Sequence, residues 1–77
     1  MVEIKLLSLN KGLALIECFP EGKEEDAFQL LLNVENRTII KNSSNEYNNY
    51  ALHASHKIFD LYATTGSIPQ TATSIWY

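Results

Sequence analysis

Three side chains that could do chemistry recur at one-turn spacings in the second half of the chain. His53, His56 and Asp60 project onto one polar face of a predicted helix. Two imidazoles and a carboxylate at these spacings could approach a metal ion together, and His56 and Asp60 are close enough to touch as an acid–base pair. A metal site needs a fourth ligand or an open position, which the sequence does not identify. A solvated helix face is therefore the preferred interpretation, and a small enzyme or metal-binding protein is the alternative.

The remaining reactive residues lack a recognisable motif. Cys18 is the only cysteine, has no flanking motif and projects toward the predicted core, which indicates an inert buried thiol. The acidic run Glu21–Asp26 does not match a calcium-binding loop, and no glycine-rich phosphate-binding loop is present. The sequence therefore predicts no catalytic residue, no bound metal and no cofactor.

Composition limits the partners and the compartment. The 77 residues, 45% of them hydrophobic, predict one globular domain over residues 1–77. The net charge is −3 and the lysines and arginine are scattered, which disfavours nucleic-acid binding. No apolar run is long enough to span a membrane, and the first residues lack a signal-peptide pattern. A single cysteine cannot form an internal disulfide, so we expect a cytoplasmic protein.

The N-terminal third of the sequence predicts a β-hairpin. Val2–Leu9 and Leu13–Phe19 flank Asn10-Lys11-Gly12, and Gly12 can supply the positive φ that ends a three-residue loop. Such a loop pairs Leu9 with Leu13. One hairpin face is then apolar, with Val2, Ile4, Leu6, Ala14, Ile16 and Cys18.

Residues 24–34 fit either a strand or a helix. The alternation of Phe28, Leu30, Leu32 and Val34 has strand period, while the acidic residues before it would suit a helix N-terminus. The strand is favoured because Asn36-Arg37 and the β-prone run 38–41 would complete a second hairpin.

A helix is predicted from Ser44 to Thr65. Ser43 and Glu46 have the spacing of a capping box, and an apolar stripe that includes Ile58 repeats with helical period. Gly66 is placed to end the helix in the left-handed conformation.

The predicted fold class is α+β. It is a four-stranded antiparallel meander (ββββ), with one long helix in the C-terminal half packed on one face and an ordered C-terminal tail. The tail ends in Ile75-Trp76-Tyr77, and the sequence leaves open whether these residues join the core or an interface.

The second face of the first hairpin supplies the functional hypothesis. The predicted register places Leu7, Leu9, Leu13 and Leu15 on the face that the helix does not cover, with Phe19 on the same face and Trp76 nearby. Large exposed apolar patches usually mark interfaces. We therefore expect a small non-enzymatic interaction or regulatory module that binds a protein partner or forms a homodimer. In the competing arrangement, the tail seals the patch within one chain.

Overall fold

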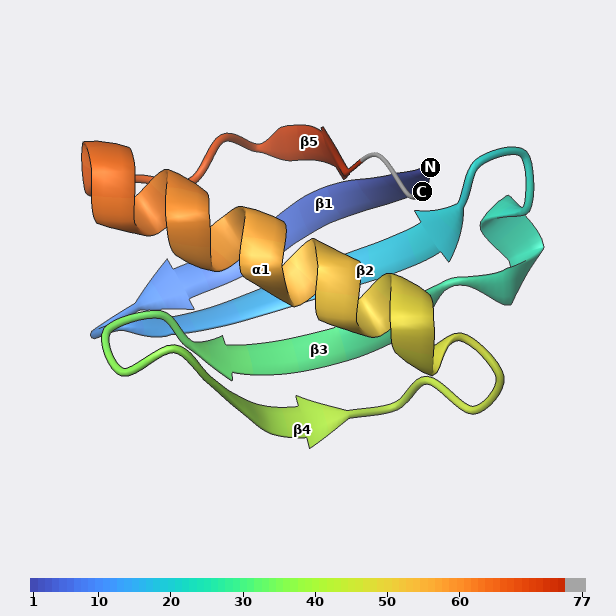
Figure 1. The fold of residues 1–77 in the computed structure, drawn as a ribbon, viewed down its shortest axis with the longest axis horizontal. Helices are drawn as coiled ribbons and strands as arrows, with labels where there is room; N and C mark the ends of the chain where they lie inside the picture. Colours follow the sequence, from blue (N-terminus) through green and yellow to red (C-terminus); the bar gives the residue numbers. More distant parts are fainter. Residues whose placement is uncertain (75–77) are drawn as a thin grey trace.

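The computed structural model describes residues 1–74, which form a five-stranded antiparallel sheet crossed on one face by a single α-helix (Figure 1). The strand order is β4-β3-β2-β1-β5. In chain order the elements are β1 (Val2–Asn10), β2 (Leu13–Pro20), a short 3₁₀ helix (Glu24–Asp26), β3 (Phe28–Asn33), β4 (Thr38–Asn42), α1 (Asn48–Thr65) and β5 (Thr71–Ser74).

The predicted four-stranded meander is wrong, although the α+β class holds. Strands β1 to β4 follow one another as a meander, and a fifth strand after the helix pairs antiparallel with β1, with Ile4 opposite Ala72. Gln70 leads into this strand: its carbonyl accepts the Leu6 N–H at 2.9 Å, and its side-chain amide donates to the Leu6 carbonyl at 3.0 Å. The segment thereby satisfies backbone groups that an open edge of β1 would leave unpaired.

The turn of the first hairpin has two residues, not the three that the sequence predicted. Lys11 and Gly12 both have positive φ, 53° and 79°, as a type I′ turn requires, so Asn10 lies opposite Leu13. The register nevertheless recovers further along: Lys5 lies opposite Glu17, as expected. A β-bulge between Leu6 and Ser8 makes up the difference.

The ambiguous segment 24–34 contains a strand, and the second predicted hairpin is confirmed. Its acidic start forms only the three-residue 3₁₀ helix, whereas Phe28–Asn33 pairs with β2 on one side and β4 on the other. The loop between β3 and β4 ends at Arg37, which has φ of 59°. The β3–β4 ladder also shifts register, which leaves Ile40 as an extra residue in β4.

The helix ends where predicted but begins four residues late. Gly66 has φ of 73° and donates its N–H to the Tyr62 carbonyl at 2.8 Å. The capping box is wrong: Ser43 exchanges hydrogen bonds with Gln29 of β3, accepting its N–H at 2.8 Å and donating to its carbonyl at 3.0 Å. This contact keeps residue 43 beside the sheet, so the helix begins only after Tyr47, which makes no side-chain cap.

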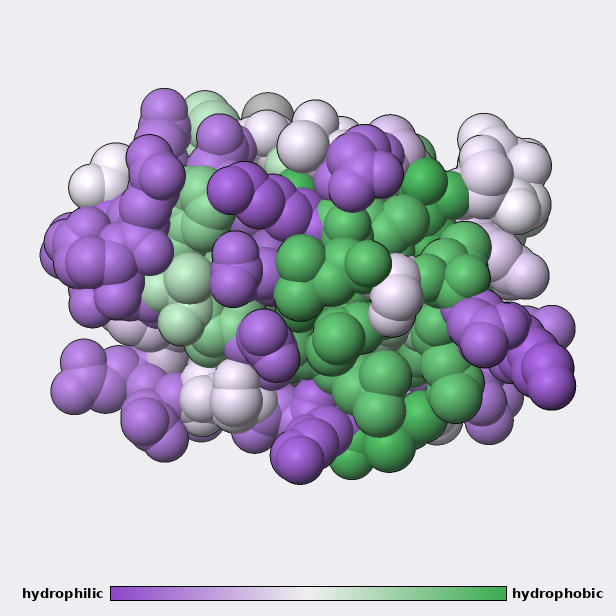
Figure 2. Space-filling view, turned by 180° about the vertical axis from the view of Figure 1, so that it is seen from behind, coloured by the Kyte–Doolittle hydropathy of each residue, from purple (hydrophilic) through white to green (hydrophobic). Residues whose placement is uncertain are grey.

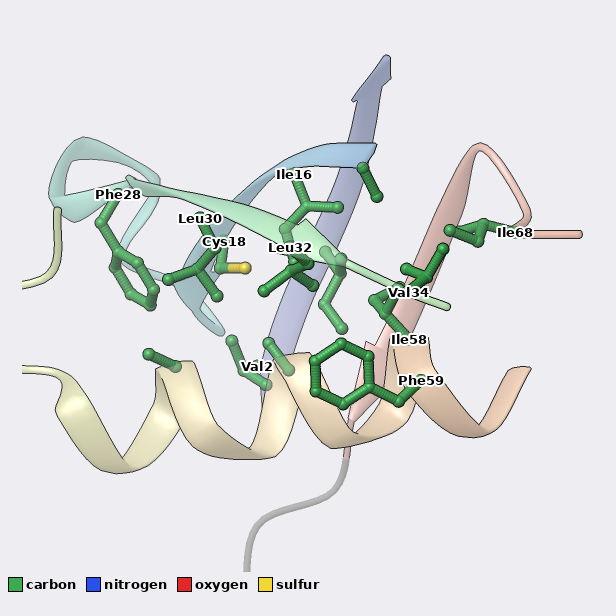
Figure 3. Close-up of a cluster of buried hydrophobic side chains, with 14 residues drawn as sticks. Val2, Ile16, Cys18, Phe28, Leu30, Leu32, Val34, Ile58, Phe59 and Ile68 are labelled. Atoms are coloured by element: carbon green, nitrogen blue, oxygen red, sulfur yellow. The ribbon is translucent and has the colours of Figure 1, made fainter. Parts of the chain in front are cut away.

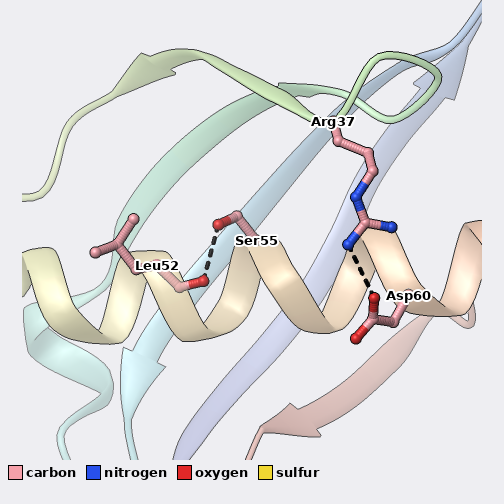
Figure 4. A network of polar contacts seen from close by, with 4 residues as sticks. All are labelled: Arg37, Leu52, Ser55 and Asp60. Carbon is pink, nitrogen blue, oxygen red and sulfur yellow. Dashed lines mark hydrogen bonds and ion pairs between the residues drawn. The ribbon is translucent and has the colours of Figure 1, made fainter.

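The core lies between α1 and one face of the sheet (Figure 3). Ile58 is fully buried there, as are Ile16 and Leu30 from the two central strands. Ser55 is a buried polar exception, and its hydroxyl donates to the Leu52 carbonyl at 2.9 Å (Figure 4). The sheet face that packs against α1 is called the inner face below. It forms an apolar layer with the helix, and the buried Ser55 hydroxyl has a hydrogen-bond acceptor.

Candidate interaction surface

The opposite, outer face of the sheet has no helix packed on it (Figures 1 and 2). Two β-bulges decide which side chains it presents. In β1, Leu6 pairs with Ile16 and Leu9 with Ala14, and both partners belong to the buried core. Because Leu6 and Leu9 thus share the inner face, the two residues between them, Leu7 and Ser8, both point outward.

The bulge in β4 has the same effect. Ile39 lies opposite Leu32 and Asn42 lies opposite Leu30, and both partners are fully buried on the inner face. Ile40 and Lys41, between them, are therefore both directed to the outer face. The extra residue of each bulge, Leu7 or Ile40, is thus a large apolar side chain on the exposed side of the sheet.

These side chains form one apolar patch across four strands, which Figure 2 shows as a continuous hydrophobic area. Leu15 and Leu31 lie opposite each other in β2 and β3 at its centre and are partly buried. The exposed fractions are 47% for Leu7, 40% for Leu13 and 53% for Ile40. We refer to Leu7, Leu13, Leu15, Leu31 and Ile40 as the outer patch.

The outer patch is not flat. A depression of about 400 Å³ is lined by Leu15, Gln29, Leu31, Lys41 and Ser43. The residues that line it are both apolar and polar, a mixture that is also found at protein interfaces.

The other end of the outer face is polar. The Lys5 ammonium lies 5.8 Å from the centre of the Phe19 ring, and Thr73 donates a hydrogen bond to the Glu3 carboxylate at 2.7 Å. Phe19 is only 8% exposed. It therefore offers little free surface for a partner, although it lies on the predicted face.

The predicted interface residues are only partly brought together. Leu7, Leu13 and Leu15 share the outer face, whereas Leu9 is turned to the inner face by the bulge, where it remains 38% exposed. Trp76 lies outside the described residues. Sequence reasoning missed Leu31 and Ile40; Leu31 was detectable, because it alternates with Leu30 and Leu32 in a strand whose other face is buried.

The predicted histidine–aspartate cluster does not converge. Asp60 instead accepts a hydrogen bond from the Arg37 guanidinium at 3.0 Å (Figure 4), and the same guanidinium lies 5.5 Å from the centre of the Phe59 ring. His56 packs edge-on against Phe59. No group of three histidine, cysteine or acidic side chains within residues 1–74 is arranged to hold a metal ion.

Both histidines line a separate shallow pocket on the helix. It has a volume of about 310 Å³ and is bordered by Asn49, Leu52, His53 and His56. The His53 backbone carbonyl accepts a hydrogen bond from the Ser74 hydroxyl at 3.4 Å, so the helix and the last described residue of β5 are in contact here.

Among the described residues, the two groups with shifted pKa values lie away from the outer patch. Burial, with a smaller contribution from the neighbouring Glu17 carboxylate, raises the pKa of Cys18 to about 12, so its thiol is protonated at neutral pH. The pKa of Tyr47 is also raised, chiefly because its hydroxyl donates to Asp26 at 2.8 Å. Neither group forms part of a nucleophile–base pair in the described chain.

No protein-family model matches this chain, and neither the curated proteins nor the solved structures include a significant match. In the part of the chain that the structure describes, no helix has the length and apolar character needed to cross a bilayer.

Proposed function

We propose that this chain is a small, non-enzymatic protein-interaction module that binds its partner through the outer face of the sheet. The observation that carries the proposal is the outer patch itself. It is built from five large aliphatic side chains on four adjacent strands, and three of them are at least 40% exposed. Contiguous apolar surface of this kind is rare on isolated monomers and usually marks an interface.

The construction of the sheet supports the same proposal. Burying an apolar side chain against a partner gains about 1.5–3 kcal/mol relative to leaving it in water. The extra residue of each bulge presents such a side chain on the outer face. We further propose the cytoplasm as the compartment, on the ground that the lone cysteine is buried and protonated.

Site-specific photo-crosslinking in cells tests the proposal. A photoreactive amino acid is placed at Leu31, inside the patch, and in a matched variant at Leu52, which is 50% exposed on the helix. The Leu31 position is expected to give a discrete protein adduct, identified by mass spectrometry, and the Leu52 position is not. Fractionation of the cells before analysis places the adduct in a compartment. Equal labelling from both positions, or none from Leu31, would contradict the proposal.

A further inference from the structure

We infer that the partner on the outer face is a second copy of this chain, packed sheet on sheet about a two-fold axis that runs parallel to the strands between β2 and β3. The inference rests on the proposed function and specifies its partner. Its first support is composition: the centre of the outer patch, Leu15 beside Leu31, is aliphatic and uncharged. Interfaces between identical subunits are the most apolar class of protein interface.

The size of the face is suited to such a dimer. The molecule measures 30 × 21 × 20 Å, and the sheet spreads across its two longest dimensions (Figure 1). Two sheets that pack face to face lie about 10 Å apart with their strands roughly aligned. A standard interface covers about 800 Å² of accessible surface on each partner, so a dimer of this kind would use the whole outer face, including its polar end.

The register gives this arrangement matching rows of side chains. Leu15 and Leu31 lie opposite each other on neighbouring strands, and Lys41 continues the same row in β4. Rotation about the proposed axis superimposes β2 on β3 and β1 on β4 of the second copy. Leu15 then meets Leu31 of the second copy, and Leu7 lies over its β4, beside Lys41 and Ile40. Ser8, which completes the central row in β1, then lies over Lys41 of the second copy at the edge of the interface.

The charges on the face are also self-compatible. The outer face has no net formal charge, because it carries two acidic and two basic side chains: Glu3, Glu17, Lys5 and Lys41. The whole chain, by comparison, carries −3. Lys5 and Glu17 lie opposite each other in the next polar row. The same rotation places Glu17 over Gln29 of the second copy, whose side-chain amide can donate a hydrogen bond to the carboxylate. It places Lys5 over the loop that follows β4.

The alternative two-fold axis, perpendicular to the strands, is disfavoured by burial of a charge. An axis through the central row would place Leu13 of one copy over Glu17 of the other, because these residues flank Leu15 on the same face of β2. Covering a carboxylate with an aliphatic side chain removes its water without supplying a partner. The strand-parallel axis avoids this contact.

Sedimentation velocity at several concentrations tests the inference with two complementary variants, Leu7→Lys and Ile40→Glu. Both residues are about half exposed, so each variant is expected to fold, which circular dichroism checks. The wild type is expected to be dimeric. Each variant alone is expected to be monomeric at the same concentration, because its charge is pressed against an aliphatic side chain. An equimolar mixture is expected to recover the dimer, because the introduced amine and carboxylate then lie on facing strands, close enough for these long side chains to form an ion pair.

The control is Leu52→Lys, which alters a comparably exposed leucine on the helix and is expected to remain dimeric. A monomeric wild type would contradict the inference that the partner is a second copy. The proposed function would still hold if photo-crosslinking at Leu31 gave an adduct with a different protein. A dimer that tolerates both variants would show that another surface is used. Two monomeric variants that do not combine would overturn the strand-parallel axis.

Discussion

Cys18 in β2 is fully enclosed between the sheet and the helix, and its chemistry follows from that enclosure. A thiolate in an apolar layer would lack both water and a cationic partner, so the proton is retained far above the ordinary pKa of 9.0. The side chain therefore acts as a small hydrophobic residue in the core.

The first prediction concerns the pH dependence of stability. Because the pKa of Cys18 is about 12 in the folded chain and about 9 when unfolded, the unfolded chain loses this proton first. The contribution to the free energy of unfolding is intact below about pH 9 and is lost as the pH rises toward 12. The full loss is about 4 kcal/mol at the conversion of ~1.4 kcal/mol per pKa unit. Urea unfolding from about pH 7 to pH 11 measures the first two pH units of this loss, about 3 kcal/mol.

Cys18→Ala is the control for this titration. The variant loses packing at every pH, but its stability should fall less steeply than that of the wild type above pH 9. Parallel curves for the two proteins would show that Cys18 does not cause the alkaline loss.

The second prediction concerns Gly12 in the first turn. A Cβ at this position would lie 2.7 Å from a carboxylate oxygen of Glu35, and the backbone φ is +79°. Gly22 has a similar φ of +81° with no atom near its Cβ position. Gly22→Ala should therefore cost about 1–2 kcal/mol for the conformation alone, and Gly12→Ala should cost slightly more, because the flexible Glu35 side chain must move aside. Thermal unfolding measures both.

The double variant Gly12→Ala/Glu35→Ala separates the two effects. When the Glu35 carboxylate is removed, Gly12→Ala should destabilise the fold no more than Gly22→Ala does. The effect of Glu35→Ala alone on the free energy of unfolding is subtracted in this comparison. If the excess persists, the contact with Glu35 is not its cause.

Among the secondary-structure elements, α1 is anchored by a narrow stripe of side chains. Ile58 is fully buried, whereas Leu52 on the same helix is half exposed. We predict that Ile58→Ala destabilises the fold by about 2–5 kcal/mol, because it leaves a cavity against the sheet. Leu52→Ala, with the same loss of aliphatic side chain at an exposed site, should cost under about 0.5 kcal/mol. Chemical denaturation of both variants makes the comparison, and equal losses would contradict the packing described above.

The same helix shows where sequence reasoning holds and where it does not. Its end at Gly66 was predictable, because the left-handed residue is a local requirement. Its start was not, because Ser43 satisfies Gln29 on a distant strand instead of capping the helix. The residues of the outer patch were likewise only partly predictable from the sequence. Alternation locates Leu13 and Leu15, but the bulge that turns Leu9 inward has no sequence signal.

For the molecule as a whole, the β4 edge of the sheet should be less stable than its centre. Strand β4 is exposed along most of its length, while α1 packs against β1, β2, β3 and β5. We predict that amide hydrogens of β4 exchange with solvent faster than those of the central strand β2, through local opening of that edge. Hydrogen exchange by NMR tests this, with the Leu7→Lys variant used so that association does not protect amides. Equal rates across the sheet would mean that it opens only as a unit.

The fifth strand marks the limit of the sequence prediction at this scale. The class, the two hairpins and the helix follow from local patterns. Thr71–Ser74 has no apolar alternation and becomes a strand because β1 offers it an edge. Such pairing depends on the assembled tertiary structure and leaves no trace in local composition.

The position of β5 beside β1 also determines the order in which the strands can pair while the chain is synthesised. Strand β1 is made first and β5 last among the strands of this sheet, yet the two are neighbours. A nascent chain can form the β1–β4 ladders as they emerge from the ribosome, but Ile4 and Leu6 must wait for residues 70–74 before their edge is closed. Until then β1 is an open template that another nascent chain could occupy. Pairing with β5 is therefore the step that closes the β1 edge.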